Sequence, residues 1–105
     1  MLQSDREIAM RVKSELARQA ELVELRVFGS RARGTADLES DLDLFIEVES
    51  LDRGLKAKLS EIIWEIGFDS GTVISPLFFT RKEIEQTPLR SSFIVESILT
   101  EGIPV

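Results

Sequence analysis

The sequence of 105 residues contains no cysteine and no histidine. The absence of cysteine excludes disulfide bonds and thiolate metal centres. The absence of histidine removes the side chain most often used as a general base, and with it the usual ligand of transition metals. A metal site in this chain would therefore depend on carboxylate oxygens, which favour hard cations such as Mg²⁺ or Mn²⁺.

Long apolar runs and excess positive charge are also missing. No apolar stretch approaches the roughly 20 residues of a membrane-spanning helix. The beginning, MLQSDREIAMRVK, lacks the apolar segment of a secretion signal. The net charge of −6 disfavours strong nucleic-acid binding, because contact with a phosphate backbone requires a basic surface. The sequence therefore predicts a cytoplasmic protein that does not contact a membrane.

The composition is that of an ordinary globular protein, with 43% hydrophobic and 30% charged residues. The length fits one domain over residues 1–105 with a single core. Helices are expected near residues 4–20, 51–66 and 89–100, and strands near residues 22–28, 41–48 and 72–79. This order predicts an α/β (α+β) fold, with a small mixed sheet of about three strands flanked by helices.

Local signals refine these expected elements. The first helix is amphipathic, with Val12 and Leu16 on its apolar face and charged residues, Asp5 among them, covering the outside. The stretch SRARG predicts one helical turn with Ser30 as its N-cap. Thr80 and Glu83 have the spacing of a capping box, which predicts that a short helix begins there.

Glycine and proline mark the remaining boundaries. The segment 67–71, GFDSG, predicts a turn, and Gly102 predicts the end of the last helix. The run TVISPLFF is apolar on both faces, as is typical of a covered central strand. Pro76 within it favours a bulge, or a strand with one unpaired edge.

Asp41 and Asp43 form an acidic pair on one of the expected strands. Residues at i and i+2 of a strand share one face, with side chains about 6–7 Å apart. Like charges at that separation raise each other's pKa. One interpretation is a solvated strand end, and the other is a pair of ligands whose missing partner is a divalent cation.

A glycine and a serine, Gly29 and Ser30, directly follow the first expected strand. The glycine lets a phosphate approach the backbone, the serine hydroxyl can donate to it, and N–H groups of the next turn can face the anion. Arg31 and Arg33 would add positive charge, unless they are simply solvated surface residues. Together with the acidic pair, these residues predict a Mg²⁺–polyphosphate site for phosphoryl transfer.

The stretch GSRARGTADLESDLDL, residues 29–44, resembles the signature of the polymerase-β-type nucleotidyltransferases, and among them the minimal, MNT-type group. The matching positions are Gly29, Ser30, Arg31, Gly34, Ser40, Asp41 and Asp43. The resemblance covers nearly the whole chain, because the order of elements and the C-terminal stretch also agree. It implies a palm-like nucleotidyltransferase fold.

The resemblance implies Mg²⁺-dependent transfer of a nucleoside monophosphate from an NTP, here AMP from ATP. Asp41 and Asp43 would be catalytic and would hold Mg²⁺ or Mn²⁺. The nucleotide would be bound by Gly29, Ser30, Arg31, Arg33 and Ser40. The resemblance also implies a partner, a small helical HEPN-type protein from an adjacent gene, for which this chain would be the antitoxin in a toxin–antitoxin pair.

One family feature is not evident in the sequence. The family pattern has a third carboxylate on a following strand, where this chain has Ile74 or Ser75. Asp69 is the nearest preceding acid and a candidate for that role, although it would also suit the capping of its turn. Two other hypotheses therefore stay open: a nucleotide-binding pseudoenzyme that neutralises a helical partner by contact, and a structural adaptor.

Overall fold

The computed structural model describes residues 1–35 and 39–105, apart from the side chain of residue 90. Its helices are α1 (Gln3–Ala17), α2 (Gly29–Arg33), α3 (Arg53–Ser70), α4 (Arg81–Gln86), the 3₁₀ helix η1 (Pro88–Ser91) and α5 (Phe93–Glu101). Its strands are β1 (Leu22–Phe28), β2 (Leu42–Val48), β3 (Ile74–Thr80) and β4 (Ile103–Pro104). The segment 36–38, part of the expected turn between α2 and β2, lies outside the described residues.

The strands form one mixed sheet with the order β3-β2-β1-β4. β1 pairs antiparallel with β2 and with β4, whereas β2 and β3 are parallel. The expectation of a mixed sheet flanked by helices is confirmed, but the number of strands is four rather than about three. β4 was missed because two residues, one of them Pro104, carry no alternating pattern.

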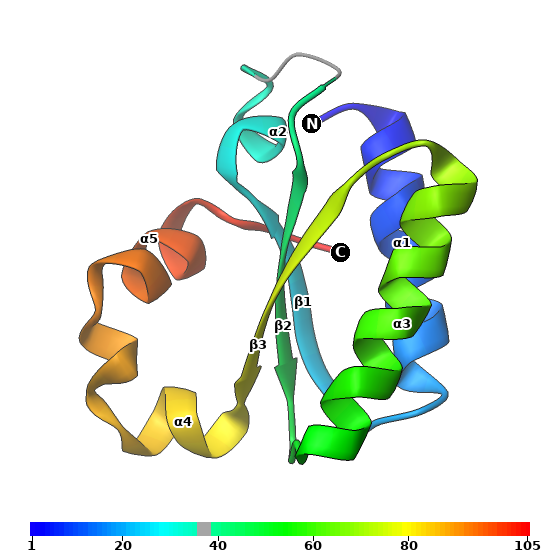
Figure 1. Ribbon diagram of the computed structural model, residues 1–105. Helices are drawn as coiled ribbons and strands as arrows, with labels where there is room; N and C mark the ends of the chain where they lie inside the picture. Colours follow the sequence, from blue (N-terminus) through cyan, green and yellow to red (C-terminus); the bar gives the residue numbers. More distant parts are fainter. Residues whose placement is uncertain (36–38) are drawn as a thin grey trace.

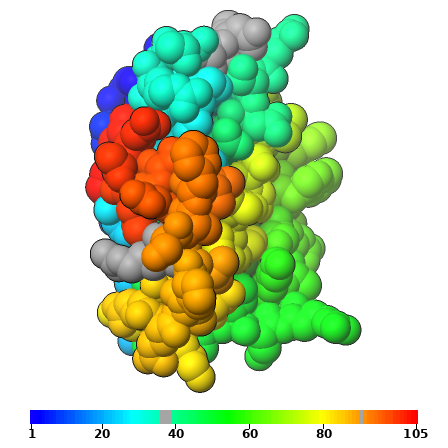
Figure 2. Space-filling view, turned by 90° about the vertical axis from the view of Figure 1, so that its left-hand side faces the viewer, coloured from blue at the N-terminus to red at the C-terminus, as the bar shows by residue number. Residues whose placement is uncertain are grey.

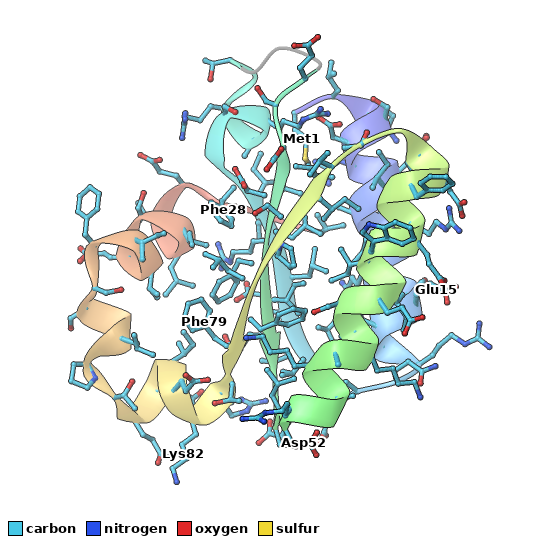
Figure 3. The ribbon with its side chains drawn as sticks, viewed as in Figure 1. Met1, Glu15, Phe28, Asp52, Phe79 and Lys82 are labelled. Atoms are coloured by element: carbon cyan, nitrogen blue, oxygen red, sulfur yellow. The ribbon has the colours of Figure 1, made fainter. Side chains whose placement is uncertain are left out.

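Helices cover both faces of the sheet (Figure 1). α1 and α3 pack on one face, where the β2 residues Leu42, Leu44, Ile46 and Val48 are fully buried, as the alternation predicts. α4 and α5 cover the other face, where Phe45 packs with Ile84, Val95 and Ile98. Figure 2 views this second side of the molecule, and in Figure 3 Phe28 and Phe79 lie between the sheet and these helices.

The position of β3 at the edge of the sheet explains Pro76. The expectation of a central strand is wrong, and the alternative of an unpaired edge is right, because an edge position tolerates a residue without an N–H group. The strand is apolar on both faces because both are covered. Ile74 and Phe78 pack toward the α1–α3 side, whereas Leu77 and Phe79 pack toward the α4–α5 side.

α3 extends four residues beyond its expected end, so the turn predicted over residues 67–71 is wrong. Gly67 is a packing position rather than a breaker, because a Cβ there would lie 2.7 Å from the carbonyl oxygen of Thr72. The helix ends at Gly71, whose φ of +67° is the left-handed conformation that glycine adopts easily.

In the C-terminal third of the chain, α4 and α5 begin at residues that cap them. The capping box is confirmed: Thr80 Oγ1 accepts from the Glu83 N–H at 3.1 Å, and Glu83 Oε1 accepts from the Thr80 N–H at 3.0 Å. The single helix expected over 89–100 is instead η1 followed by α5, which Ser92 caps. Gly102 ends α5, but with extended rather than left-handed geometry.

None of the helices in the described ranges combines the length and apolar character needed to cross a bilayer.

Candidate nucleotide and metal site

The end of β1 and the beginning of β2 bring the predicted glycine and aspartate together. Phe28 pairs with Asp43 across the two strands, and Gly29 then opens α2 with a φ of +73°. A Cβ built on Gly29 would overlap Oδ2 of Asp43. Two features therefore require glycine at this position: the backbone conformation, and the carboxylate that lies against its α-carbon.

Asp43 shares with Phe45 the sheet face that α4 and α5 partly cover, and Asp41 stands directly before the beginning of β2. Asp41 is exposed and Asp43 is partly buried. Burial, followed by the negative charge of Asp41, raises the pKa of the Asp43 carboxyl, while the positive charge of Arg33 lowers it. The carboxylate pair is thus under-compensated in the protein alone, which is the electrostatic setting in which a bound cation is favourable.

Two neighbours of the acidic pair suit phosphate. Ser30 is not the N-cap of α2 as expected, because the helix begins at Gly29 and its cap position, two residues earlier than expected, is Phe28. Within the described part of the chain, no hydrogen bond occupies the Ser30 hydroxyl, which leaves it able to donate to a ligand. Arg33 is exposed, and its effect on the Asp43 pKa places its charge within electrostatic reach of that carboxylate.

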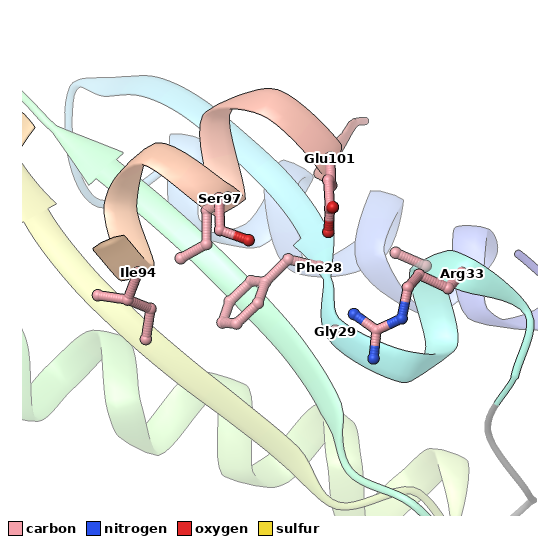
Figure 4. Close-up of a pocket in the computed structure, with 8 residues that line it drawn as sticks. Phe28, Gly29, Arg33, Ile94, Ser97 and Glu101 are labelled. Carbon is pink, nitrogen blue, oxygen red and sulfur yellow. The ribbon is translucent and has the colours of Figure 1, made fainter. Parts of the chain in front are cut away.

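A cavity of about 80 Å³ separates α2 from α5 (Figure 4). One side of the cavity is lined by residues of the candidate site, Phe28, Gly29 and Arg33. The other side is lined by α5, through Ser97 and Glu101. No local sequence pattern points to these two α5 residues, because only the tertiary packing of α5 beside β1 brings them to the turn.

Arg31 is not brought to this site. Its side chain is only 6% exposed and forms an ion pair with Asp5, with Nη1 2.7 Å from Oδ1. Its Nε also donates to the Ser40 carbonyl oxygen at 2.8 Å. The expectation that Asp5 faces solvent is wrong, because this partner draws its carboxylate inward. We call the arrangement of Asp5, Arg31 and Ser40 the Arg31 latch; it ties α1 and α2 to the chain just before Asp41.

Asp69 also lies away from the site. It is part of α3 rather than a turn, and its carboxylate forms an exposed ion pair with Arg11 of α1, at 3.2 Å. These two helices cover the face of the sheet opposite the one that Asp43 shares with Phe45. Both sequence interpretations of Asp69, as third acid and as turn cap, therefore fail to match its surroundings.

The place for a third carboxylate is now defined. Ser75 is the register partner of Asp43 in the parallel β2–β3 pair, so the two side chains share a face of the sheet. Within the described residues, no group of three or more potential ligands is found. The carboxylates of Asp41 and Asp43 would fit a Mg²⁺ ion, which prefers oxygen ligands and would take its remaining ligands from phosphate and water.

Comparison with known proteins decides the family. Residues 9–102 match the family model described as a nucleotidyltransferase domain. This chain belongs to the nucleotidyltransferase domain family. A solved structure described as a minimal nucleotidyltransferase is 30% identical, with a TM-score of 0.63, and the similarity covers 95% of this chain and 91% of that one. No curated protein gives a significant match.

These comparisons confirm the family and the fold that the resemblance implied, and the chain is accordingly a nucleotidyltransferase. Members of this family use a divalent metal ion and an NTP, and the geometry around Gly29 and Asp43 is compatible with both. The particular metal ion and nucleotide belong to the proposal below.

The Arg31 latch gives a first prediction. Asp5→Asn should lower the free energy of unfolding by about 3–5 kcal/mol, because it removes the negative charge of Asp5 from its ion pair with the buried Arg31 guanidinium. Chemical denaturation measures the loss. The matched control is Asp69→Asn, which removes one partner of an exposed pair and should cost less than about 1 kcal/mol. Similar losses in the two variants would show that the buried ion pair contributes no more to the free energy of unfolding than the exposed one.

The raised pKa of Asp43 gives a second prediction, for the protein without ligands. A carboxyl that holds its proton more tightly when folded destabilises the fold as the pH rises through its folded pKa. Asp43→Asn should therefore raise the unfolding temperature at pH 7. The gain should fade toward pH 3.8, the ordinary value, because the carboxyl is then largely protonated in the folded protein. A stability loss at pH 7 would mean that the charge is structurally required.

Proposed function

We propose that this chain transfers AMP from ATP to a small helical partner protein, using Mg²⁺ held by Asp41 and Asp43. The observation that carries the proposal is the approach of the Asp43 carboxylate to Gly29. It sets the oxygens proposed to hold the metal ion beside Gly29, which also lines the cavity between α2 and α5. Arg33 adds positive charge on the same side.

Each side chain has a distinct role in this proposal. Asp41 and Asp43 hold the metal ion, which when bound supplies positive charge to the phosphates. The Ser30 hydroxyl donates to a phosphate oxygen, and the Arg33 guanidinium pairs with another. Arg31 and Ser40, which the resemblance implied as nucleotide ligands, act instead through the latch, by holding the glycine turn and the acidic strand in register.

The reaction is a displacement at the α-phosphorus of the nucleotide. A hydroxyl oxygen of the acceptor forms the new bond to that phosphorus, the bond to the bridging oxygen breaks, and pyrophosphate leaves. The hydroxyl proton must pass to a base. With Ser75 beside Asp43 and Asp69 on the other face of the sheet, we infer that the acceptor or solvent takes this proton, and that transfer is slow.

The partner and the compartment rest on the resemblance to the MNT-type group. In that group a helical HEPN-type protein, encoded by an adjacent gene, is the target. We propose the same arrangement here, with this chain as the antitoxin. ATP is a cytoplasmic substrate, so the proposed reaction takes place in the cytoplasm.

One observation favours a second candidate function. Ser75 stands where the family pattern expects an acid, directly beside Asp43. General-base help of the kind that acid would give is worth about 10²–10⁴-fold in rate. A chain without it would serve as a nucleotide-binding pseudoenzyme that neutralises its helical partner by contact.

Incubation of the purified chain with ATP, Mg²⁺ and the product of the neighbouring gene separates the two functions. Intact-mass spectrometry of that product should show the gain of one AMP, and the Asp41→Asn/Asp43→Asn variant should abolish it. A stable complex with no mass gain would support the pseudoenzyme. Neither a complex nor a mass gain would contradict the proposal of this partner.

Binding of Mg-ATP gives a third prediction. The double change Asp41→Asn/Asp43→Asn should abolish it in isothermal calorimetry, because it removes both carboxylates proposed to hold the metal ion, and the described residues contain no group of three or more potential ligands to replace them. The control is Asp69→Asn, which also removes one carboxylate but lies on the opposite face. Loss of binding in the control, or its survival in the double variant, would place the site elsewhere.

Ser75 gives a fourth prediction. Ser75→Asp should place a third carboxylate beside Asp43, tighten Mg-ATP binding and raise the transfer rate by up to about 10²-fold. Without metal the same variant should be less stable than the wild type, because three like charges would then share the face. A rise in stability without metal, with unchanged Mg-ATP affinity, would show that residue 75 does not face the acidic pair.

A further inference from the structure

The outer surface of α3 exposes large aromatic side chains that the fold does not use. Trp64 is 67% exposed and Phe68 is 75% exposed, and their rings stack with centroids 5.6 Å apart. Val73, 66% exposed, adjoins them at a groove of about 220 Å³ beside β3. Contiguous exposed apolar surface of this kind marks an interaction site.

These aromatic residues belong to a regular seam along the helix. The seam consists of Gly54, Ala57, Glu61, Trp64 and Phe68, all of them exposed and alternately three and four residues apart. That spacing is the heptad pattern by which two helices pack along their length. The core face of α3, formed by Leu59, Ile63 and Ile66, is already buried against the sheet and α1, so the seam is a second face without a function in this fold.

The seam is complementary to itself when one copy is reversed. Its N-terminal half has the small residues Gly54 and Ala57, and its C-terminal half has the large residues Trp64 and Phe68. In an antiparallel pair of α3 helices, Trp64 of one copy lies over Ala57 of the other, and Phe68 lies over Gly54. The space above Gly54 is open, since a Cβ there would meet only Asp52 Oδ1, at 3.5 Å.

Charge follows the same symmetry. Lys58 and Glu65 are exposed and lie seven residues apart, on the same flank of the seam. A two-fold axis between antiparallel helices keeps each flank on its own side, so Lys58 of one copy meets Glu65 of the other, and the reverse. Glu61 lies at the two-fold axis, opposite Glu61 of the other copy. A polar residue at such a seam position weakens the contact but fixes its register.

We propose that two copies of this chain associate through antiparallel α3 helices. A single helix seam buries less than the roughly 1,200 Å² of a standard stable interface, and both copies carry a net charge of −6. The dimer is therefore weak, with dissociation in the high micromolar range. The edge of β3 does not contribute to the dimer interface by strand pairing, because Pro76 removes an N–H group from it. The proposed nucleotide site remains open, since α3 lies on the opposite face of the sheet.

Sedimentation velocity between about 5 μM and 1 mM protein, at physiological ionic strength, tests the proposal. The wild type should show a reversible monomer–dimer equilibrium. Emission from Trp64, the single tryptophan, should shift to shorter wavelength as the dimer forms. Ala57→Gln should abolish both changes by filling the space that receives Trp64. The control is Ala17→Gln, the same substitution at an exposed position of α1, which should leave them intact.

A charge exchange tests the geometry itself. Lys58→Glu and Glu65→Lys should each weaken the dimer by roughly tenfold, because each creates two like-charge contacts. The double variant Lys58→Glu/Glu65→Lys should restore the wild-type dissociation constant. A chain that stays monomeric at 1 mM would overturn the proposal and assign the seam to a different protein. A dimer that the exchange does not restore would overturn the antiparallel arrangement.

Discussion

The carboxylate of Asp43 lies against the α-carbon of Gly29, and no side chain fits between them. Because β1 and β2 are antiparallel, the end of one strand and the beginning of the other must meet, and this contact is where they do. In the proposed function, a phosphate at the turn of Gly29 and Ser30 would lie within reach of a metal ion held by the acidic pair. The site is a consequence of strand pairing rather than of a long active-site loop.

The Arg31 latch stabilises the contact between Gly29 and Asp43, because it holds α2 against α1 and against the residue that precedes Asp41. A buried ion pair is costly to desolvate, so its two charges must be well paired to be tolerated. Here the guanidinium meets both the Asp5 carboxylate and the Ser40 carbonyl. Arg31 and Arg33 therefore have different surroundings on α2. The Arg31 side chain points inward and fixes the turn, whereas Arg33 is exposed and would supply charge to the proposed ligand.

Much of the fold was predictable from local patterns. The alternation in β2, the helical spacing of α1 and α3 and the capping box at Thr80 each depend on neighbours in sequence, and each is confirmed. Errors arose where tertiary contacts decide. Gly67 was interpreted as a turn residue but serves close packing against Thr72, and the two-residue β4 exists only because β1 offers it an edge.

The same division applies to the candidate site. The positions of Gly29, Asp41 and Asp43 follow from a short motif, so the sequence predicted them together. The inward direction of Arg31 depends on Asp5, 26 residues away, and could not be inferred from local spacing. The position of Ser75 beside Asp43 required the parallel register of β2 and β3, which the sequence left uncertain by one residue.

The central claim of the proposed function is that metal and phosphate meet at the glycine turn, beside Gly29 and Asp43. Its most direct measurement is the amide NMR spectrum of the chain with ATP during a titration with Mn²⁺, whose unpaired electrons broaden nearby resonances. The account predicts that the signals of Gly29, Ser30 and Asp43 disappear first, while those of the C-terminal half of α3 persist. Broadening that begins around Asp69, or that is the same in the Asp41→Asn/Asp43→Asn variant, would contradict it.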